Sequence, residues 1–362
     1  MIERHSMNRF GISAILLFLA ISSAGSVMAQ TNPSGSTLTS TLFQNSSVLV
    51  NDGTIITNSY ANRGIVNFVG GTTTNNGTIT TYGEQSHGIE TSGAVSIYNN
   101  GTITTYGTSN GIGAGSSGPT SLVNTGFITT SNAATVAIYD TLFITNSGSI
   151  ISNSTSYSTL YLGGAGFNLT NSGTISSASD AIKAWTSGSM GTLTNTGTIT
   201  EGNGYYGINY TGSINTINNS QGAGNAAGAL TLYGQMPQNY NVIINSPTNY
   251  GQLAITDPTS ISFNFGIDSS STLTVGTYSD VFQGLPSTYN INGSSGSFGA
   301  FTYSLQYDAS QGAANDWSLV VSASAVAPEM DGSLIPQVTL MLACLFFLMG
   351  RKKENVEPMH TV

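Results

Sequence analysis

The sequence predicts an all-β protein folded as a right-handed parallel β-helix, or β-solenoid, of about seven to eight coils. A short phrase, Asn-x-Gly-x-Ile, occurs seven times, and its glycines are 24, 24, 25, 22, 25 and 24 residues apart. The repeated unit is also rich in Thr, Ser, Asn, Gly and Ile, which favour strands and turns over helices. A fixed period of about 20 to 50 residues is typical of stacked-repeat architectures.

One unit illustrates the expected coil. Residues 77–100 read GTITTYGEQSHGIETSGAVSIYNN, and three short strands are predicted in them, at 78–82, 88–91 and 94–98. Glycines and small polar residues separate the strands, as turns require. About three strands per unit make one coil, which cannot bury its inner face alone and therefore stacks on its neighbours.

Two apolar columns are expected inside the solenoid. Strand alternation sends Ile79 to one face and Thr78 and Thr80 to the other, so the isoleucine of each phrase should point inward. A second column is expected four positions before each glycine, interrupted at Thr73. The isoleucines of the first column are Ile55, Ile79, Ile103, Ile128, Ile150, Ile175 and Ile199. The residues of the second column are Leu49, Ile97, Leu122, Ile144, Leu169 and Leu193.

The asparagine of each phrase is expected to form a third column at a corner. Asparagine tolerates a left-handed backbone conformation, and its side chain can hydrogen-bond to its own turn. Stacked asparagine side chains can also form amide-to-amide hydrogen bonds along the axis. The glycine two positions later is expected to supply a backbone angle that a Cβ would resist. Because the asparagine recurs in every coil, a structural role is favoured over a ligand site. These residues are Asn51, Asn75, Asn99, Asn124, Asn146, Asn171 and Asn195.

Two smaller expectations concern the edges of this pattern. A further, degenerate coil is predicted around residues 214–220, with Ser220 at the place of the glycine. Thr130 is expected on a polar stretch near the corner of Asn124, where truncation to alanine would cost under about 0.5 kcal/mol.

The first 29 residues have the features of a secretory signal peptide. Arg4 and Arg9 form a basic start, residues 10–21 are an apolar run too short for a comfortable membrane span, and small residues precede Gln30. The mature chain is therefore expected to begin at Gln30. The alternative is an uncleaved membrane anchor.

The other end of the chain has three parts in a fixed order. Pro328 and Glu329 come first, an apolar stretch at 334–350 follows, and Arg351, Lys352 and Lys353 come directly after it. This resembles the sorting tails of the PEP-CTERM family, although Met330 stands where that family has a second proline. The resemblance implies removal of the tail by an exosortase-type membrane protease, in a protein bound for the surface or extracellular matrix of a bacterium with two membranes.

A plain C-terminal membrane anchor is the alternative interpretation of this tail. Both interpretations predict membrane contact through residues 334–350. Both also place the rest of the chain outside the cytoplasm, because basic residues stay on the cytoplasmic side.

The chain between the ends divides in two. Residues 30–48 are expected to be an N-terminal cap, 49–225 the repeats, and 226–325 a β-rich capping domain, followed by the tail at 326–362. The segment 250–256 resembles the region where the β-helix of autotransporter passengers ends. A cap is needed because an open coil end is an exposed strand edge.

Composition excludes several classes of function. Charged residues make up only 6% of the chain, which contains 7 Lys and Arg in all. So few cations cannot neutralise phosphates, and nucleic acid is not expected as a partner. The chain has 1 cysteine, Cys344, within the tail, so no disulfide is expected in the body. No His/Cys spacing of a metal site and no cofactor motif is present.

The resemblance to autotransporter and adhesin-type β-helices covers residues 40–325. It implies a non-enzymatic protein of the bacterial cell surface or matrix, acting in adhesion or as a biofilm scaffold and contacting glycans, matrix or other cells. No catalytic residue is assigned.

Two alternatives stay open. A polysaccharide lyase or hydrolase would need clustered carboxylates, or a carboxylate-bound metal with a base. An ice-binding solenoid would use outward Thr-x-Thr pairs such as Thr78 and Thr80, but Phe127 and Ile151 interrupt that file. The candidates for the enzyme are Glu84, His87 and Glu90 in one coil, Asp180 and Lys183 in another, and Asp140.

Overall fold

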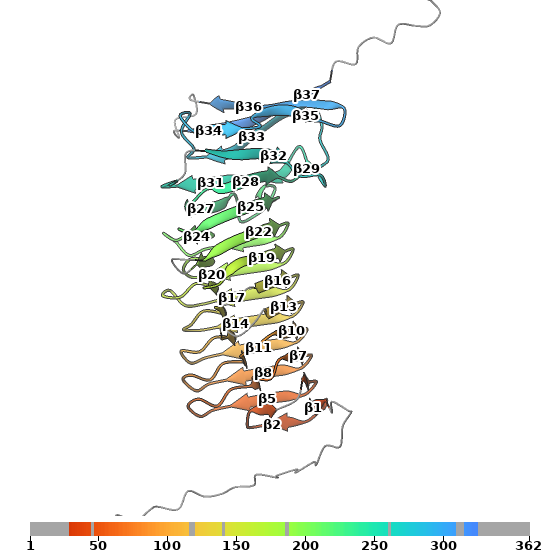
Figure 1. The fold of residues 1–362 in the computed structure, drawn as a ribbon, viewed down its shortest axis with the longest axis vertical. Coiled ribbons are helices and arrows are strands. Elements are labelled where there is room, and N and C mark those ends of the chain that lie inside the picture. Colours follow the sequence, from red (N-terminus) through yellow and green to blue (C-terminus); the bar gives the residue numbers. More distant parts are fainter. Residues whose placement is uncertain are drawn as a thin grey trace, which may run out of the picture.

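The computed structural model describes residues 29–44, 47–115, 120–139, 142–184, 188–259, 262–308 and 315–324. This part of the chain forms strands β1 to β37 and no helix. The strands stack in parallel coils along one long axis, with β1 and β2 at one end and β35, β36 and β37 at the other (Figure 1). The predicted parallel β-solenoid is confirmed, with about ten turns in place of seven to eight.

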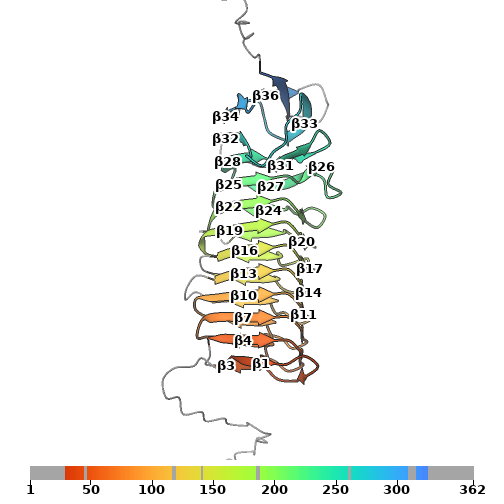
Figure 2. The ribbon, with the colours of Figure 1, turned by 90° about the vertical axis from the view of Figure 1, so that its right-hand side faces the viewer.

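Three long sheets form the rod, and each of the first eight coils contributes one strand to each sheet. Sheet 2 then ends at β23, whereas sheets 1 and 3 continue. Sheet 1 comprises β1 (Gln30–Asn32), β4 (Val48–Asn51), β7 (Gly71–Asn75), β10 (Val95–Asn99), β13 (Thr120–Asn124), β16 (Leu142–Asn146), β19 (Ala165–Asn171), β22 (Ser189–Asn195), β25 (Ser213–Asn219), β28 (Pro237–Val242), β32 (Ser262–Ile267) and β34 (Asn290–Asn292). Figure 2 shows the strands of this sheet one above another.

Sheets 2 and 3 complete the coils. Sheet 2 comprises β2 (Thr37–Leu38), β5 (Thr54–Thr57), β8 (Thr78–Thr81), β11 (Thr102–Thr105), β14 (Phe127–Thr130), β17 (Ser149–Ser152), β20 (Thr174–Ser177) and β23 (Thr198–Thr200). Sheet 3 comprises β3 (Leu42–Gln44), β6 (Ile65–Asn67), β9 (Ile89–Thr91), β12 (Ile112–Ala114), β15 (Val136–Ile138), β18 (Leu160–Leu162), β21 (Ile182–Ala184), β24 (Ile208–Tyr210), β27 (Leu230–Gly234), β31 (Leu253–Thr256), β33 (Gly276–Gln283), β37 (Asp316–Ala323), β36 (Phe301–Asp308) and β35 (Ser295–Phe298).

The core consists of apolar columns in register. The seven phrase isoleucines pair coil to coil in sheet 2, as Ile79 does with Ile103, and all are fully buried. The column through Leu49 and Ile97 lies inside sheet 1, and sheet 3 adds a third column that includes Ile89. Thr73 interrupts the sheet 1 column, and its hydroxyl accepts a hydrogen bond from Asn67 Nδ2 at 3.1 Å. This polar side chain in the sheet 1 column is therefore hydrogen-bonded.

The asparagines form a continuous ladder at the corner between sheets 1 and 2. Each Nδ2 donates to Oδ1 of the next coil's asparagine, over distances of 2.7 to 2.9 Å from Asn51 to Asn195. Asn32 adds a rung below Asn51 at 2.7 Å, and Asn219 adds one above Asn195 at 3.2 Å. The ladder thus contains nine asparagines, all buried. The seven asparagines of the repeated phrase account for its middle.

The upper end of the ladder is closed by a glutamine. Asn195 lies in register with Asn219, so Gln221, and not Ser220, occupies the position of the phrase glycine. Gln221 Oε1 accepts hydrogen bonds from Asn195 Nδ2 at 3.1 Å and from the Ile199 N–H at 2.7 Å. Its Nε2 donates to the Ile199 carbonyl at 2.9 Å. The side chain satisfies the backbone of the last strand of sheet 2, β23.

The corner glycine is needed for space and not for a special backbone angle, which corrects the sequence-based expectation. Gly101 does not have a positive φ, and neither does any ladder asparagine. The N–H groups of Asn100 and Gly101 both donate to the Asn75 carbonyl, at 2.8 and 3.0 Å. This draws the corners so close that a Cβ on Gly101 would lie 2.0 Å from the Gly77 carbonyl oxygen.

The structure does not support a small cost for truncating Thr130. Its side chain is fully buried, and its hydroxyl donates to the Ala133 carbonyl at 2.8 Å and contacts the Thr135 hydroxyl at 3.0 Å. Alternation along β14 explains this, since Ile128 and Thr130 point inward and Thr129 points outward. A threonine or serine holds the same buried position in the neighbouring coils, as Thr105 and Ser152 do.

Parallel stacking continues beyond the joint expected near residue 225. Strands β28, β32 and β34 extend sheet 1, and β27, β31 and β33 extend sheet 3. A small antiparallel sheet of β26 (Gly222–Ala223), β30 (Asn249–Gly251) and β29 (Ile244–Ser246) follows the end of sheet 2. Antiparallel pairing of β33, β37, β36 and β35 then covers the end of the rod (Figure 1).

Aromatic side chains fill the core of these last coils in place of the ladder. Val242 follows Asn219 in register, and the amide column ends there. The Phe282 ring lies 5.1 Å from that of Tyr240 and 5.3 Å from that of Phe263, between ring centroids. Large rings supply the contacts that stacked amides make lower in the rod.

Among the described residues, no helix is long and apolar enough to span a membrane. The apolar stretch at 334–350 lies outside these residues, as do positions 1–28 of the expected signal peptide. The sorting residues Pro328, Glu329, Arg351, Lys352 and Lys353 also lie outside them, and so does Asp140.

Candidate functional site

The outer face of sheet 3 carries a column whose residues change from coil to coil. The middle residue of each short strand points outward and pairs in register with its neighbour in the next coil. Size and charge change at almost every step, and the side chains are smallest at the third and fourth positions. Along the axis the column reads Val66, Glu90, Gly113, Ala137, Tyr161, Lys183 and Asn209.

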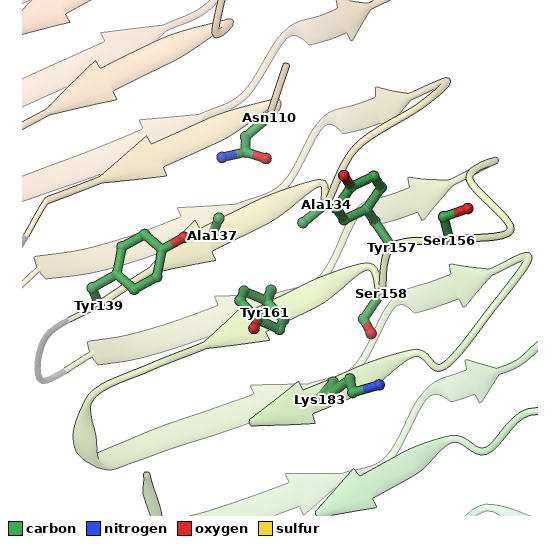
Figure 3. A pocket seen from close by; sticks show the side chains of 9 residues that line it. All are labelled: Asn110, Ala134, Ala137, Tyr139, Ser156, Tyr157, Ser158, Tyr161 and Lys183. Carbon is green, nitrogen blue, oxygen red and sulfur yellow. The ribbon is translucent and has the colours of Figure 1, made fainter. Parts of the chain in front are cut away.

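A groove lies over Ala137, the fourth residue of this column. It has a volume of about 420 Å³, and its lining comes from four consecutive coils. Tyr139 and Tyr157 stand on opposite sides of an alanine floor, and Tyr161 and Lys183 lie toward one end (Figure 3). The lining residues are Asn110, Ala134, Ala137, Tyr139, Ser156, Tyr157, Ser158, Tyr161 and Lys183. A hollow of about 320 Å³ adjoins the groove, shares Asn110 and Tyr139, and reaches His87 and Glu90.

The walls and the floor differ in exposure. Ala137 is only 2% exposed, whereas Tyr139 is 44% and Tyr157 54% exposed. Tyr139 follows β15, and Tyr157 lies in the loop between β17 and β18. The Ser154 hydroxyl accepts hydrogen bonds from the N–H groups of Ser156 and Tyr157, both at 3.2 Å. These bonds fix the loop, so that Tyr157 is presented from a held backbone.

The end of the hollow nearest the N-terminal coils carries an ion pair and a histidine. Glu90 pairs with Arg63 of the preceding coil. His87 Nδ1 accepts a hydrogen bond from the Asn110 N–H at 3.0 Å. Burial, and secondly the charge of Arg63, lower the pKa of His87 below its usual 6.5. The imidazole is therefore neutral at pH 7.

The opposite end is centred on the buried carboxylate of Asp180. It accepts hydrogen bonds from the Tyr206 N–H at 3.1 Å and from Asn209 Nδ2 at 2.8 Å. Lys183 Nζ lies 3.5 Å from the same carboxylate. The Lys183 charge at the groove is thus balanced by a neighbour three residues away. Nearby, burial raises the pKa of Glu201, whose carboxylate accepts a hydrogen bond from the Thr231 hydroxyl at 2.7 Å.

The residues considered for catalysis do not meet in one place. Glu84 is exposed and does not line the groove, whereas His87 and Glu90 line the adjoining hollow. Lys183 lies four coils further along sheet 3 than Glu90, about 19 Å away at ~4.8 Å per coil. The described residues contain no group of three or more side chains suited to hold a metal ion.

The outward Thr-x-Thr pairs considered for ice binding lie on sheet 2. Thr78 pairs with Thr102, and Thr80 with Thr104, which gives two short threonine files. Phe127 and Ile151 interrupt these files in the next coils, and Ile56 does so in the preceding one. The described face is therefore not a regular threonine plane.

Sequence reasoning missed the tyrosines of the groove. Tyr139 and Tyr161 each stand 13 residues after the glycine of their phrase, and Tyr157 stands 9 residues after Gly148. The equal spacing of the first two does not reveal the site, because Tyr161 pairs in register with Ala137 and not with Tyr139. A usable signal was the outward position of each sheet 3 strand, where Gly113 and Ala137 follow one another between larger residues. Comparison with protein-family models, curated proteins and solved structures finds no match for this chain.

Proposed function

We propose that this chain is an exported, non-enzymatic protein of the bacterial cell surface or extracellular matrix, and that it acts as a stiff adhesive or biofilm scaffold. The observation that supports this best is the unbroken ladder of nine buried asparagines, which ties each coil to the next from Asn32 to Asn219. Stacked amides and isoleucines of this kind favour a rigid rod that holds its surface at a distance from an anchor.

The chemistry of the surface supports contact with uncharged polar partners. The basic residues in the described part are Arg63 and Lys183, and each is paired with a carboxylate. Hydroxyl, amide and aromatic groups therefore dominate the contacts that the rod can make. Such groups suit glycans, matrix and the surfaces of other cells.

The two ends of the sequence support export. The first strand of the rod begins at Gln30, the residue at which the mature chain is expected to start. The tail, with Pro328, Glu329 and the basic cluster after residue 350, supports sorting at a membrane and processing by a membrane protease.

The test compares the host bacterium with a strain that lacks the gene. Mass spectrometry of fractionated cells identifies both termini of the protein, and aggregation and matrix retention are measured in parallel. We expect surface-bound or released protein that starts at Gln30, and weaker aggregation without the gene. Cytoplasmic protein with its first residues intact, or unchanged aggregation, contradicts the proposal.

A second assay separates the scaffold from a polysaccharide-degrading enzyme. The purified protein is incubated with pectin and with alginate, and new chain ends are counted. We expect none. Turnover that disappears in Glu90→Gln or His87→Gln would replace the scaffold with an enzyme.

A further inference from the structure

We propose that the groove on the outer face of sheet 3 binds one chain of a neutral polysaccharide, laid along the rod axis between Tyr139 and Tyr157. The inference deepens the proposed adhesive function and takes its biological meaning from it. The site itself is argued from shape, chemistry and charge.

The groove has the size and direction for a short run of sugar rings. Its volume of about 420 Å³ falls within the range of about 300–1,000 Å³ common for ligand sites. Its lining runs from Asn110 to Lys183 over four coils, a distance of about 14 Å at ~4.8 Å per coil. The length of one ring along an extended pyranose chain is similar to the ~4.8 Å spacing of the coils, so successive rings meet successive coils.

The side chains match the two faces of a sugar. The C–H face of a pyranose packs on aromatic rings, and tyrosine offers an apolar ring with a hydroxyl at its edge. Tyr139 and Tyr157 face each other across the alanine floor, with Tyr161 beyond them (Figure 3). Asn110 and Ser156 add amide and hydroxyl groups that can pair with sugar hydroxyls.

The charges of the groove favour a neutral chain. Lys183 at one end of the groove is balanced by Asp180, and Glu90 in the adjoining hollow is balanced by Arg63. An anionic polysaccharide would find here only cations that are already paired with a carboxylate of the protein. It would also meet a protein with a formal net charge of −9.

The backbone at this site does not favour a peptide. A peptide commonly binds a sheet by adding a strand to an open edge. The strands beneath the groove, β12, β15 and β18, are each paired on both sides. Recognition here therefore depends on side chains, as it does for a sugar.

The experiment titrates the full chain, extracted from the cell surface, by isothermal calorimetry. The neutral probes are cellohexaose, mannohexaose and maltohexaose, and the anionic probe is hexagalacturonate. We expect at least one neutral probe to bind with an affinity that does not change with salt, since no net charge is involved. Tyr157→Ala and Tyr139→Ala should each weaken binding about tenfold or more.

Two further variants make the result specific. Gly113 lines the adjoining hollow, and an added Cβ there has room, since its nearest neighbour is 3.5 Å away in the His87 ring. Gly113→Leu should therefore fill the hollow, so that fewer sugar rings of the probe contact the protein. Tyr106→Ala is the matched control. Tyr106 is 49% exposed and stacks on Tyr82 at 4.9 Å, but it does not line the groove. It should leave the affinity unchanged while melting curves show that every variant is folded.

Several outcomes would overturn the inference. They are preference for hexagalacturonate with strong salt dependence, binding of none of the probes, and equal losses in Tyr106→Ala and Tyr157→Ala. A measurement of cell aggregation distinguishes failure of the groove proposal from failure of the proposed scaffold function. If Tyr157→Ala loses no sugar binding while deletion of the gene still weakens aggregation, the groove is excluded and the scaffold stands.

Discussion

Two glycines of a single coil, Gly101 and Gly113, are under opposite constraints. Gly101 lies at the interior corner, where an added Cβ would be 2.0 Å from a backbone oxygen of the preceding coil. Gly113 lies on the outer face of sheet 3, where the nearest atom to an added Cβ is 3.5 Å away, at ordinary contact distance. The first glycine recurs in every phrase, and the second has a different residue above and below it.

The difference follows from parallel stacking. An inward side chain touches its counterpart in the next coil, so asparagine must meet asparagine and isoleucine must meet isoleucine. An outward side chain meets solvent as well as its neighbour, and the column can change from Glu90 to Tyr161 within three coils. The interior therefore determines the rod, and the exterior is where a specific site can be placed.

The largest effect is expected from Gly101→Ala. The methyl group would strike the Gly77 carbonyl, and the coils could relieve the clash only by separating, at about 3 kcal/mol or more. Gly113→Ala is the control and should change the free energy of unfolding by less than about 0.5 kcal/mol. Denaturant unfolding measures both. Similar losses for the two variants would contradict the comparison.

A smaller but clear effect is expected at the ladder. Asn99→Ala leaves Asn75 Nδ2 and Asn124 Oδ1 without their buried partner, which should cost about 2–4 kcal/mol. Asn100, the next residue, also bonds a neighbouring asparagine, Asn76, but does so in solvent. Asn100→Ala should therefore cost less than about 0.5 kcal/mol. Equal melting temperatures for these neighbours would remove the energetic role of the buried ladder.

Thr130 and Thr129 test the same contrast between inward and outward side chains, here with hydroxyl groups. Thr130→Ala removes a buried donor to the Ala133 carbonyl and should cost about 1–2 kcal/mol. Thr129→Ala, on the outer side of the same strand, should be neutral within about 0.5 kcal/mol. If thermal melting ranks the two variants the other way, the inward assignment of Thr130 is wrong.

The smallest effect is a pH dependence on the outer face. The pKa of His87 is below 6.5, so the folded chain binds fewer protons than the unfolded chain in the window below that value. Stability from the neutral imidazole is complete above about pH 6.5 and is lost as pH falls through the lowered pKa. We expect His87→Gln to remove this part of the dependence in calorimetric melts.

Glu201 supplies the control for that measurement. Its pKa is raised above the usual 4.5, so its contribution has the opposite sign, and the wild type gains stability as pH falls through that raised value. Glu201→Gln should therefore be more stable than the wild type at pH 7 and should lose this advantage in acid. Wild-type and His87→Gln curves of identical shape below pH 6.5 would contradict the burial of His87.

Repetition explains what could be predicted from the sequence. The isoleucines could be placed inside because seven copies of one phrase specify the period and the alternation. Asn32 escaped notice because the step to Asn51 is only 19 residues and Ser34 stands where the phrase has its glycine. Asn219 was missed although it lies 24 residues after Asn195, because Gln221 replaces the glycine.

The candidate groove could not be predicted from periodicity. It depends on the small outward side chain of Ala137, and on three tyrosines in different settings: Tyr139 after β15, Tyr157 in a loop and Tyr161 within β18. The expectation for Thr130 has a related weakness, since it rested on the polar composition of the stretch and not on alternation along the strand, which directs Thr130 inward. The reason for the corner glycines was also beyond the sequence, because it depends on the distance between two coils.

The most direct test of the ladder is a double-mutant cycle on Asn99 and Asn124, joined by a buried bond of 2.7 Å. The control cycle uses Asn76 and Asn100, joined by an exposed bond of 2.8 Å. The free energy of unfolding is measured for each single and double alanine variant. We predict a coupling of at least about 0.5 kcal/mol for the buried pair and near zero for the exposed pair. Additive losses at Asn99 and Asn124 would contradict the claim that stacked asparagines hold the coils together.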